Sequence, residues 1–337
     1  MAGSTITKLV EGSLVTSFNL AGVFDMMSAD KAQSSLNLED DDTDTVKDLL
    51  TAIAEATLAP FSHCKSYTIT FDSGYDDGII NDYEPADYFY VAAGESRLSA
   101  FRKLIRTTKC KAIIKADGAI HVFNPTVSGT SYDYEFNDAV TNHNFFEKGV
   151  RKRLVLPNYV TVQSHPDHEN QYSGYATDAD SYAALGRYIR SRPYYIRATS
   201  DAQCTAIATA ILQHIQVASE RGHGFAPMNC GQEVMDYVKI TDSVASDTRT
   251  GNIGYIARRY SPSKQFSMEF RFGKIEAEMP FMQGVGEAEP FVTWEAWNQL
   301  VAYIDEKDND LLRFILEMNT VPRWHVTKEL RIPEAYN

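Results

Sequence analysis

The stretch ESRLSAFRKLIRTTKCKAIIKADGAIHVFNP, residues 95–125, contains a helical pattern followed directly by a strand pattern. Ser96 is a favourable N-cap, and the apolar residues after it recur at helical spacing: Leu98, Phe101, Leu104 and Ile105. Two apolar-rich segments, 111–115 and 119–123, then flank an Ala-Asp-Gly turn, where Gly118 tolerates a positive φ. The stretch therefore predicts a helix that leads into a β-hairpin.

A second helix is predicted upstream of this unit. Thr43 or Asp44 caps a segment whose apolar positions fall at i, i+3, i+4, i+7 and i+8, namely Val46, Leu49, Leu50, Ile53 and Ala54. The alternating segment Ser66–Phe71 predicts a half-buried strand. Residues 1–42 alternate weakly and end in the acidic run Glu39–Asp42, so we expect one or two strands and a loop there.

Downstream of the hairpin, an apolar-rich strand is expected from Arg153 to Gln163, with Pro157 indicating an edge or a bulge. A short helix is predicted over Ser181–Arg190. Ser200-Asp201-Ala202-Gln203 is a capping box, and it opens a helix with one stripe formed by Ile207, Ile211, His214, Ile215 and Ala218. We interpret His214 as a polar group at the surface of that helix.

Three further strands are predicted at 237–241, 254–259 and 265–272. The last alternates strictly, which places four large side chains on one face: Phe266, Met268, Phe270 and Phe272. Strands mixed with segregated helices, and no regular βαβ alternation, predict an α+β fold with antiparallel, barrel-like sheets and packed helices.

Composition excludes several classes of function. The 337 residues carry a net charge of −13, and the dense basic run Lys148–Arg153 stands alone, so we expect no specific nucleic-acid partner. The four cysteines are far apart and are expected to be reduced thiols. No apolar run approaches 18 residues and the first residues have no apolar core, so we expect neither a membrane span nor a signal peptide.

Two segments are candidate cation sites. His165-Pro166-Asp167-His168 places two imidazoles and a carboxylate close together, but at a spacing of i, i+3 around a proline, which favours a hydrated loop over a metal site. Asp72–Gly78 with Glu84 partly matches a calcium loop, but Tyr75 occupies a ligand position, so only a looser cation site stays open. No nucleotide-binding or nucleophile motif occurs. We therefore predict no catalytic, cofactor-binding or metal-binding residues and no enzyme.

From Asp44 to Ile275 the order of these features resembles that of bacteriophage tail hub (baseplate hub or tail tip hub) proteins. The matching pieces, in chain order, are DDTDTVKDLLTAIAEAT (41–57), YTITFDSG (67–74), the 95–125 unit, RKRLVLPNYVTVQS (151–164) with Asn158, Val160 and Val162, then Asp178, Ser181, Gly186 and Arg187, then Val238, Ile240 and Asp242, and finally Ile253-Gly254-Tyr255-Ile256 with RRYSPSKQFSMEFRFG (258–273).

This resemblance implies a structural virion protein that forms a ring-shaped hub at the distal end of a phage tail tube and joins tube to tip. It implies a homotrimer, whose other partners are the tail tube protein and the tail tip, fibre or tape-measure proteins. It also implies a location in the virion tail after assembly in the host cytoplasm. The expected domains are 1–42, a possible remnant of a first barrel; 43–150, an α+β hub domain; 151–275, a second barrel-like hub domain; and 276–337, a helical segment and an extended arm.

The C-terminal segment 276–337 has no counterpart in the resemblance, and it contains all three tryptophans of the chain. Its apolar residues are either core or a partner-docking surface, and the candidate interface consists of Trp294, Trp297, Trp324, Leu330, Ile332 and Tyr336. Two other functions stay open: a receptor- or carbohydrate-binding tail tip module, and a tail-associated hydrolase on a hub scaffold.

Overall fold

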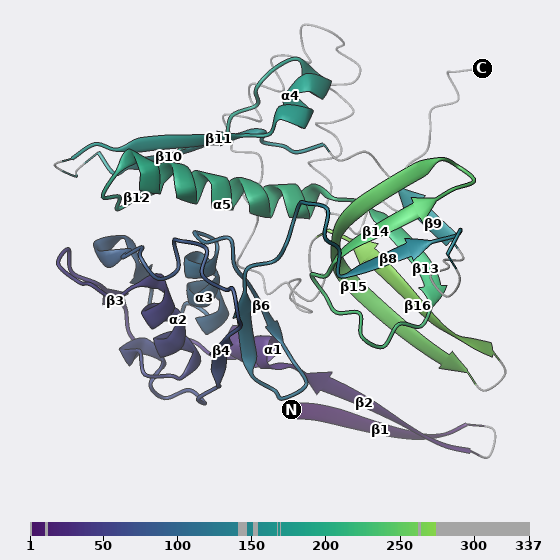
Figure 1. The fold of residues 1–337 in the computed structure, drawn as a ribbon. Coiled ribbons are helices and arrows are strands. Elements are labelled where there is room, and N and C mark those ends of the chain that lie inside the picture. The colour runs from purple at the N-terminus through teal and green to yellow at the C-terminus, as the bar shows by residue number, and fades with distance from the viewer. Residues whose placement is uncertain are drawn as a thin grey trace, which may run out of the picture. The chain divides into compact units, whose positions relative to one another are not determined.

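The computed structural model describes residues 2–10, 13–140, 147–150, 154–166, 168, 170–261 and 264–273 (Figure 1). The helices are α1 Val23–Ala29, α2 Val46–Ala54, α3 Arg97–Ile105, α4 Ala179–Leu185 and α5 Asp201–Ser219. The strands are β1 Ala2–Val10, β2 Ser13–Ala21, β3 Leu36–Asn37, β4 Ile69–Phe71, β5 Tyr90–Val91, β6 Lys111–Ile114, β7 Ile120–Phe123, β8 Tyr134–Asn137, β9 Glu147–Val150, β10 Tyr159–Ser164, β11 Ser173–Thr177, β12 Tyr194–Ile196, β13 Gly222–Pro227, β14 Tyr237–Asp242, β15 Asp247–Ser261 and β16 Lys264–Phe272. The predicted α+β class is confirmed.

The chain divides into two compact units, Met1–Phe281 and Met282–Asn337, and all the described residues belong to the first. Among those described residues, no helix is both long enough and apolar enough to cross a bilayer. The six residues of the predicted C-terminal interface lie in the second unit, outside the described residues.

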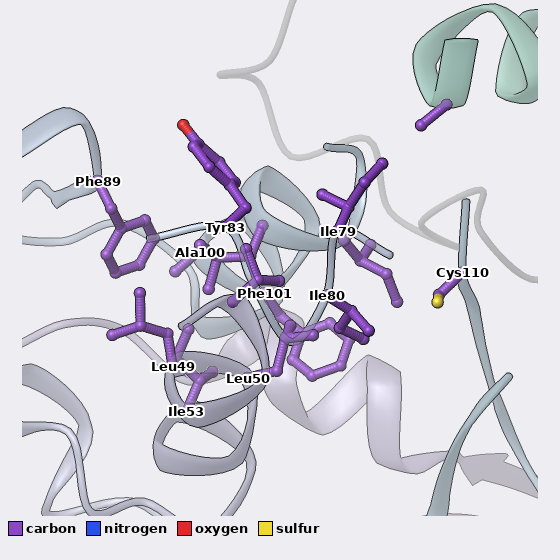
Figure 2. Close-up of a cluster of buried hydrophobic side chains, with 14 of the residues drawn as sticks. Leu49, Leu50, Ile53, Ile79, Ile80, Tyr83, Phe89, Ala100, Phe101 and Cys110 are labelled. Carbon is purple, nitrogen blue, oxygen red and sulfur yellow. The ribbon is translucent and has the colours of Figure 1, made fainter. Parts of the chain in front are cut away.

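Helices α2 and α3 form the centre of the first hydrophobic core. Ser96 caps α3 as predicted, by accepting a hydrogen bond from the backbone N–H three residues on. The cap predicted for α2 at Thr43 or Asp44 is wrong, because Thr45 forms a capping box with Asp48 and the helix begins after it. All five apolar positions predicted for α2 are buried. Figure 2 shows how residues from both helices and from the loop between them converge on this core, including Leu49, Leu50, Ile53, Ile79, Ile80, Tyr83 and Phe101.

The predicted hairpin is confirmed as β6 and β7, which pair antiparallel and are joined by a turn in which Gly118 has a φ of +80°. Strand β4 joins the same sheet by pairing parallel to β7. Ile69 of β4 pairs with Ile120 of β7, so the third strand of this sheet comes from a segment about 50 residues earlier in the chain.

Two sequence predictions in the middle of the chain need correction. The strand predicted over 153–163 begins only at Tyr159, because the chain bends at residues 156–158, which include Pro157. The helix predicted over 181–190 is α4, which begins after the cap Asp178 and ends at Gly186 with a φ of +66°. Helix α1 lies in the segment for which only strands and a loop were expected.

The largest sheet has six strands in the order β8-β14-β15-β16-β13-β9, and it curls strongly (Figure 1). Its pairs are antiparallel except for β14 with β8. Its buried face carries Phe136, Ala226, Val238, Ile240, Ile253, Met268, Phe270 and Phe272. Phe266 departs from the predicted stripe, since 52% of it is exposed near the end of the pairing with β13. Among the described strands the order is open, with β8 and β9 at its ends.

Candidate interface surface

A three-stranded sheet, in the order β11-β10-β12, lies with one face on helix α5 (Figure 1). Along β10, Val160 and Val162 are fully buried, whereas Tyr159 and Thr161 are only half-buried. Because side chains alternate along a strand, Tyr159 and Thr161 lie on the face opposite α5. One face of the sheet is thus core and the other is accessible.

The close packing of this sheet on α5 depends on Gly174 in β11. A Cβ added at Gly174 would lie 2.3 Å from the backbone nitrogen of Thr205, a distance that real Cβ atoms do not reach. The missing side chain therefore allows the strand and the helix backbone to meet directly.

Two polar side chains hold the segment after β11 in place. Asp178 accepts a hydrogen bond from the backbone N–H of Ser181 at 2.8 Å and another from the Gln216 amide of α5, also at 2.8 Å. The fully buried Asn158 accepts from the N–H of Ile189 at 2.6 Å and donates to the carbonyl of Arg187 at 3.1 Å. These bonds fix both α4 and the turn after it against the start of β10.

Four tyrosines then form a continuous stack on the accessible face. Tyr159 and Tyr175 lie parallel with ring centroids 5.2 Å apart, Tyr188 meets Tyr159 edge-on at 5.4 Å, and Tyr182 stacks on Tyr188 at 4.3 Å. The guanidinium of Arg190 lies 4.5 Å from the centroid of the Tyr159 ring. We call these five residues the tyrosine–arginine surface.

The tyrosine–arginine surface is accessible and already ordered. Tyr175 is 59% exposed, Tyr182 40% and Tyr188 45%. Because the rings support one another, a partner that packs on them immobilises few free side chains. Tyrosine and arginine are also the residue types that most often dominate the binding energy of protein interfaces.

The segment that supplies Tyr182, Tyr188 and Arg190 to this surface is locally cationic on an anionic chain. Residues 181–200 contain four arginines and no acidic residue, although the whole chain has a net charge of −13. Arg197 pairs with Asp87 at 3.2 Å, whereas Arg187, Arg190 and Arg192 are exposed and have no carboxylate partner among the described residues. Three exposed guanidinium groups, of which that of Arg190 lies over the Tyr159 ring, are therefore available to an acidic partner.

The candidate metal loop at His165 lies at the other end of β10. The ring of His165 contacts the rings of Tyr88 and Tyr195, each at a centroid distance of 5.9 Å. Gln171 closes the loop by donating to three of its carbonyls, including that of His168 at 2.6 Å. Asp167 lies outside the described residues. Within the described parts of the chain, no three His, Cys, Asp or Glu side chains gather as a metal site requires.

The carboxylates of the partial calcium loop have other roles in the fold. Asp72 accepts hydrogen bonds from Lys115 at 2.8 Å and from His121 at 2.7 Å. Asp76 accepts a backbone N–H within the loop, and Asp77 accepts three, from Ile79, Ile80 and Lys109. These acidic residues therefore order the loop and connect it to the β6–β7 hairpin.

Buried titratable groups near α5 are held neutral. Burial lowers the pKa of His214 to about 3, and its Nε2 lies 2.7 Å from the carbonyl of Thr108. The interpretation of His214 as a surface group is therefore wrong, because α5 packs on the loop before β6 at this point. All four cysteines are free thiols, and burial raises the pKa of Cys110 to about 12 and that of Cys204 to about 11.

The sequence patterns did not single out the tyrosine–arginine surface, although a signal for it was present. Six of the 19 tyrosines of the chain fall within residues 172–195, together with three arginines. The residues of the surface follow neither a helical nor a strand period, because Tyr159 comes from β10, outside this range, and the others come from β11, α4 and the turn after α4. Only the folded chain brings them into contact.

No known protein family matches the chain, and no curated protein does. Solved structures similar to it include the 43 kDa tail protein of prophage MuSo2 from Shewanella oneidensis, with 10% identity, a TM-score of 0.49 and coverage of 81% of this chain and 78% of that chain. A tail protein from Neisseria meningitidis MC58 has 13% identity, a TM-score of 0.48 and coverages of 80% and 78%. Prophage tail protein gp18 from Listeria monocytogenes EGD-e has 11% identity, a TM-score of 0.49 and coverages of 82% and 78%. These three solved structures are tail proteins, two of them from prophages.

Proposed function

We propose that this chain is a structural virion protein that forms a ring-shaped hub at the distal end of a phage tail tube and joins the tube to the tip. The observation that carries the proposal is the tyrosine–arginine surface, a rigid and exposed set of the residue types that form interfaces. The order of sequence features from residue 44 to residue 275 supports the same role, since it resembles that of tail hub proteins.

In this proposal the hub is a homotrimer that also binds the tail tube protein and the tail tip, fibre or tape-measure proteins. It is assembled in the host cytoplasm and ends in the virion tail. Segments 43–150 and 151–275 act as its two hub domains, with barrel-like closure of the curled six-stranded sheet. The C-terminal residues Trp294 and Trp297, together with Trp324, Leu330, Ile332 and Tyr336, act as a second contact surface.

Negative-stain microscopy and light scattering of the purified full chain test the assembly. We expect a ring with threefold symmetry, either alone or after the tail tube protein of the same phage is added. A stable monomer at high concentration that also leaves the tube protein unbound contradicts the proposal.

The second candidate is a carbohydrate-binding tip module, which is favoured by the exposure of three stacked tyrosine rings. Aromatic faces stack on the apolar C–H faces of sugar rings, and Arg190 beside them can donate to hydroxyl or carboxylate groups. Binding of the purified chain to a glycan array, lost in a Tyr175→Ala/Tyr188→Ala variant that still forms rings, would favour this function for the surface.

A further inference from the structure

We infer that the tyrosine–arginine surface of one copy binds the acidic segment 39–44 of a second copy. The inference rests on the proposed ring assembly and adds to it the two surfaces that meet. Its cationic side consists of Arg190, whose guanidinium lies over the Tyr159 ring, and of the exposed Arg187 and Arg192, which are three and two residues away from it in the chain.

The acidic segment 39–44 reads Glu-Asp-Asp-Asp-Thr-Asp and precedes helix α2. Glu39, Asp40 and Asp41 are exposed, and none of the segment's carboxylates has a Lys, Arg or His partner among the described residues. Partial burial and the neighbouring charges of Asp42 and Asp48 raise the pKa of Asp44. Negative charge is thus concentrated in this segment without compensation from the described residues of its own copy.

The two surfaces match in chemistry. Guanidinium groups bind carboxylates through paired, charge-assisted hydrogen bonds. The inferred contact would bring three arginines of one copy to a segment with five carboxylates of the other. Within one copy, the described residues show no contact between the two surfaces, so each remains available to a neighbour. Packing against the tyrosine rings would exclude water and strengthen those ion pairs.

A second copy fits this surface better than a nucleic acid does. The net charge of −13 repels a polyanion over the rest of the molecule, whereas the acidic segment brings a short, local negative charge. When the reciprocal contact is not made, contact between two different patches is heterologous, and repeated contacts of that kind close into a ring if the rotation between copies allows it. The inferred contact is therefore compatible with the proposed ring.

Charge reversal on each side tests the inference. Arg187→Glu/Arg190→Glu/Arg192→Glu reverses the surface, and Glu39→Lys/Asp40→Lys/Asp41→Lys reverses the segment. We expect each triple variant to weaken self-association of the full chain by about tenfold or more, measured by sedimentation velocity. The chain with all six substitutions should regain association, because the two charges are then exchanged.

Three control variants keep the result interpretable. Lys31→Glu/Lys65→Glu/Arg106→Glu changes the net charge by the same amount at exposed positions elsewhere, and it should associate like the wild type. Arg187→Gln/Arg190→Gln/Arg192→Gln removes the charge without reversing it, and it takes the place of the glutamate variant if that variant fails to fold by circular dichroism. Tyr90→Ala removes an exposed tyrosine outside the surface and should leave association unchanged.

The outcomes distinguish a failure of the inference from a failure of the proposed function. If the wild type forms rings and the charge-reversed variants form them equally well, the inference is overturned and the hub proposal stands. If the variant with all six substitutions folds but does not regain association, the inference is overturned as well. If the wild type is a monomer with or without the tube protein, the proposed function fails, and the inference fails with it. If the Tyr175→Ala/Tyr188→Ala variant loses glycan binding but still forms rings, the surface binds a carbohydrate instead and the inference is overturned.

Discussion

Arg97 and Arg190 both lie over a tyrosine ring, yet the two arginines have opposite surroundings. Arg97 is fully buried, 5.1 Å from the Tyr67 centroid, and its guanidinium donates to the carbonyls of Ile53, Ala54 and Lys65 and to Asp30. Arg190 is exposed over Tyr159 and has no carboxylate partner among the described residues.

The different surroundings of the two arginines give them different roles. Arg97 donates to the carbonyls of Ile53 and Ala54, the last two residues of α2, which have no partner within that helix. Its hydrogen bonds therefore stabilise the fold. Arg190 keeps its donors in solvent, where an isolated charge adds little to stability but is available to a partner. Arginine on tyrosine therefore stabilises the fold in one region of the molecule and leaves an accessible charge in the other.

The largest expected effect is on stability at Arg97. Arg97→Met keeps most of the side-chain volume but removes the charged donor of Asp30 and of the Lys65 carbonyl, and one of two donors to the carbonyls of Ile53 and Ala54, so we expect the free energy of unfolding to fall by about 3–5 kcal/mol. Urea denaturation measures it. The matched variant Arg190→Met should change the free energy of unfolding by less than about 0.5 kcal/mol. Equal losses in the two variants would contradict the comparison.

A smaller effect is expected at Gly174, where the sheet meets α5. Gly174→Ala forces a methyl group against the backbone of Thr205, and we expect a loss of about 1–3 kcal/mol in the free energy of unfolding. Gly231→Ala is the control, because its added Cβ would have only Asn229 within 4 Å, at 3.6 Å, and the expected change is less than about 1 kcal/mol. A neutral Gly174→Ala would show that the sheet and the helix are less closely packed than described.

The pH dependence of stability distinguishes the region of β4, β6 and β7 from the tyrosine–arginine surface. Hydrogen bonds to Asp72 and then to Asp117 raise the pKa of His121 above 6.5. Burial acts to raise the pKa of Asp72, but the hydrogen bonds from Lys115 and His121 outweigh it and hold that pKa below 3.8. The pKa of Asp117 is lowered by the backbone N–H of Ala119 and then by His121.

The sign of the effect follows from these directions. A raised pKa of His121 contributes stability that is complete below pH 6.5 and is lost as the pH rises through the folded-state pKa. The lowered pKa values of the two aspartates contribute stability above pH 3.8 that is lost as the pH falls. His121→Gln should therefore destabilise most between about pH 4 and 6.5 and progressively less at higher pH. Thermal melts across pH 4–9 measure this, with the exposed His63→Gln as the control. A difference between wild type and His121→Gln that does not change with pH would refute the prediction.

The smallest effect on stability is expected at Tyr175, which belongs to the surface rather than to the core. Tyr175→Ala should change the free energy of unfolding by less than about 0.5 kcal/mol but weaken self-association by about 1–2 kcal/mol. Tyr90→Ala, at 55% exposure compared with 59%, is the matched control. A large loss of stability in Tyr175→Ala would mean that the tyrosine stack is part of the fold and not an interface.

Local patterns predicted several elements correctly. Ser96 and Ser200 cap α3 and α5 as expected, because capping depends only on residues within one turn. The β6–β7 hairpin was predicted for the same reason, since Gly118 supplies the turn between two adjacent segments. The end of α4 was missed, although Gly186 is a common terminator, because the alanines before it and the arginines after it suit a longer helix.

The sequence by itself determined the α+β class, helix α2, the helices α3 and α5 with their caps, and the hairpin, since each depends on neighbours in the chain. The tertiary structure alone decided the parallel pairings of β4 with β7, β12 with β10 and β8 with β14, which join segments far apart in sequence. It also decided the different roles of Arg97 and Arg190. An arginine's role is set by what surrounds its guanidinium, and in this protein those groups come from several distant segments of the chain.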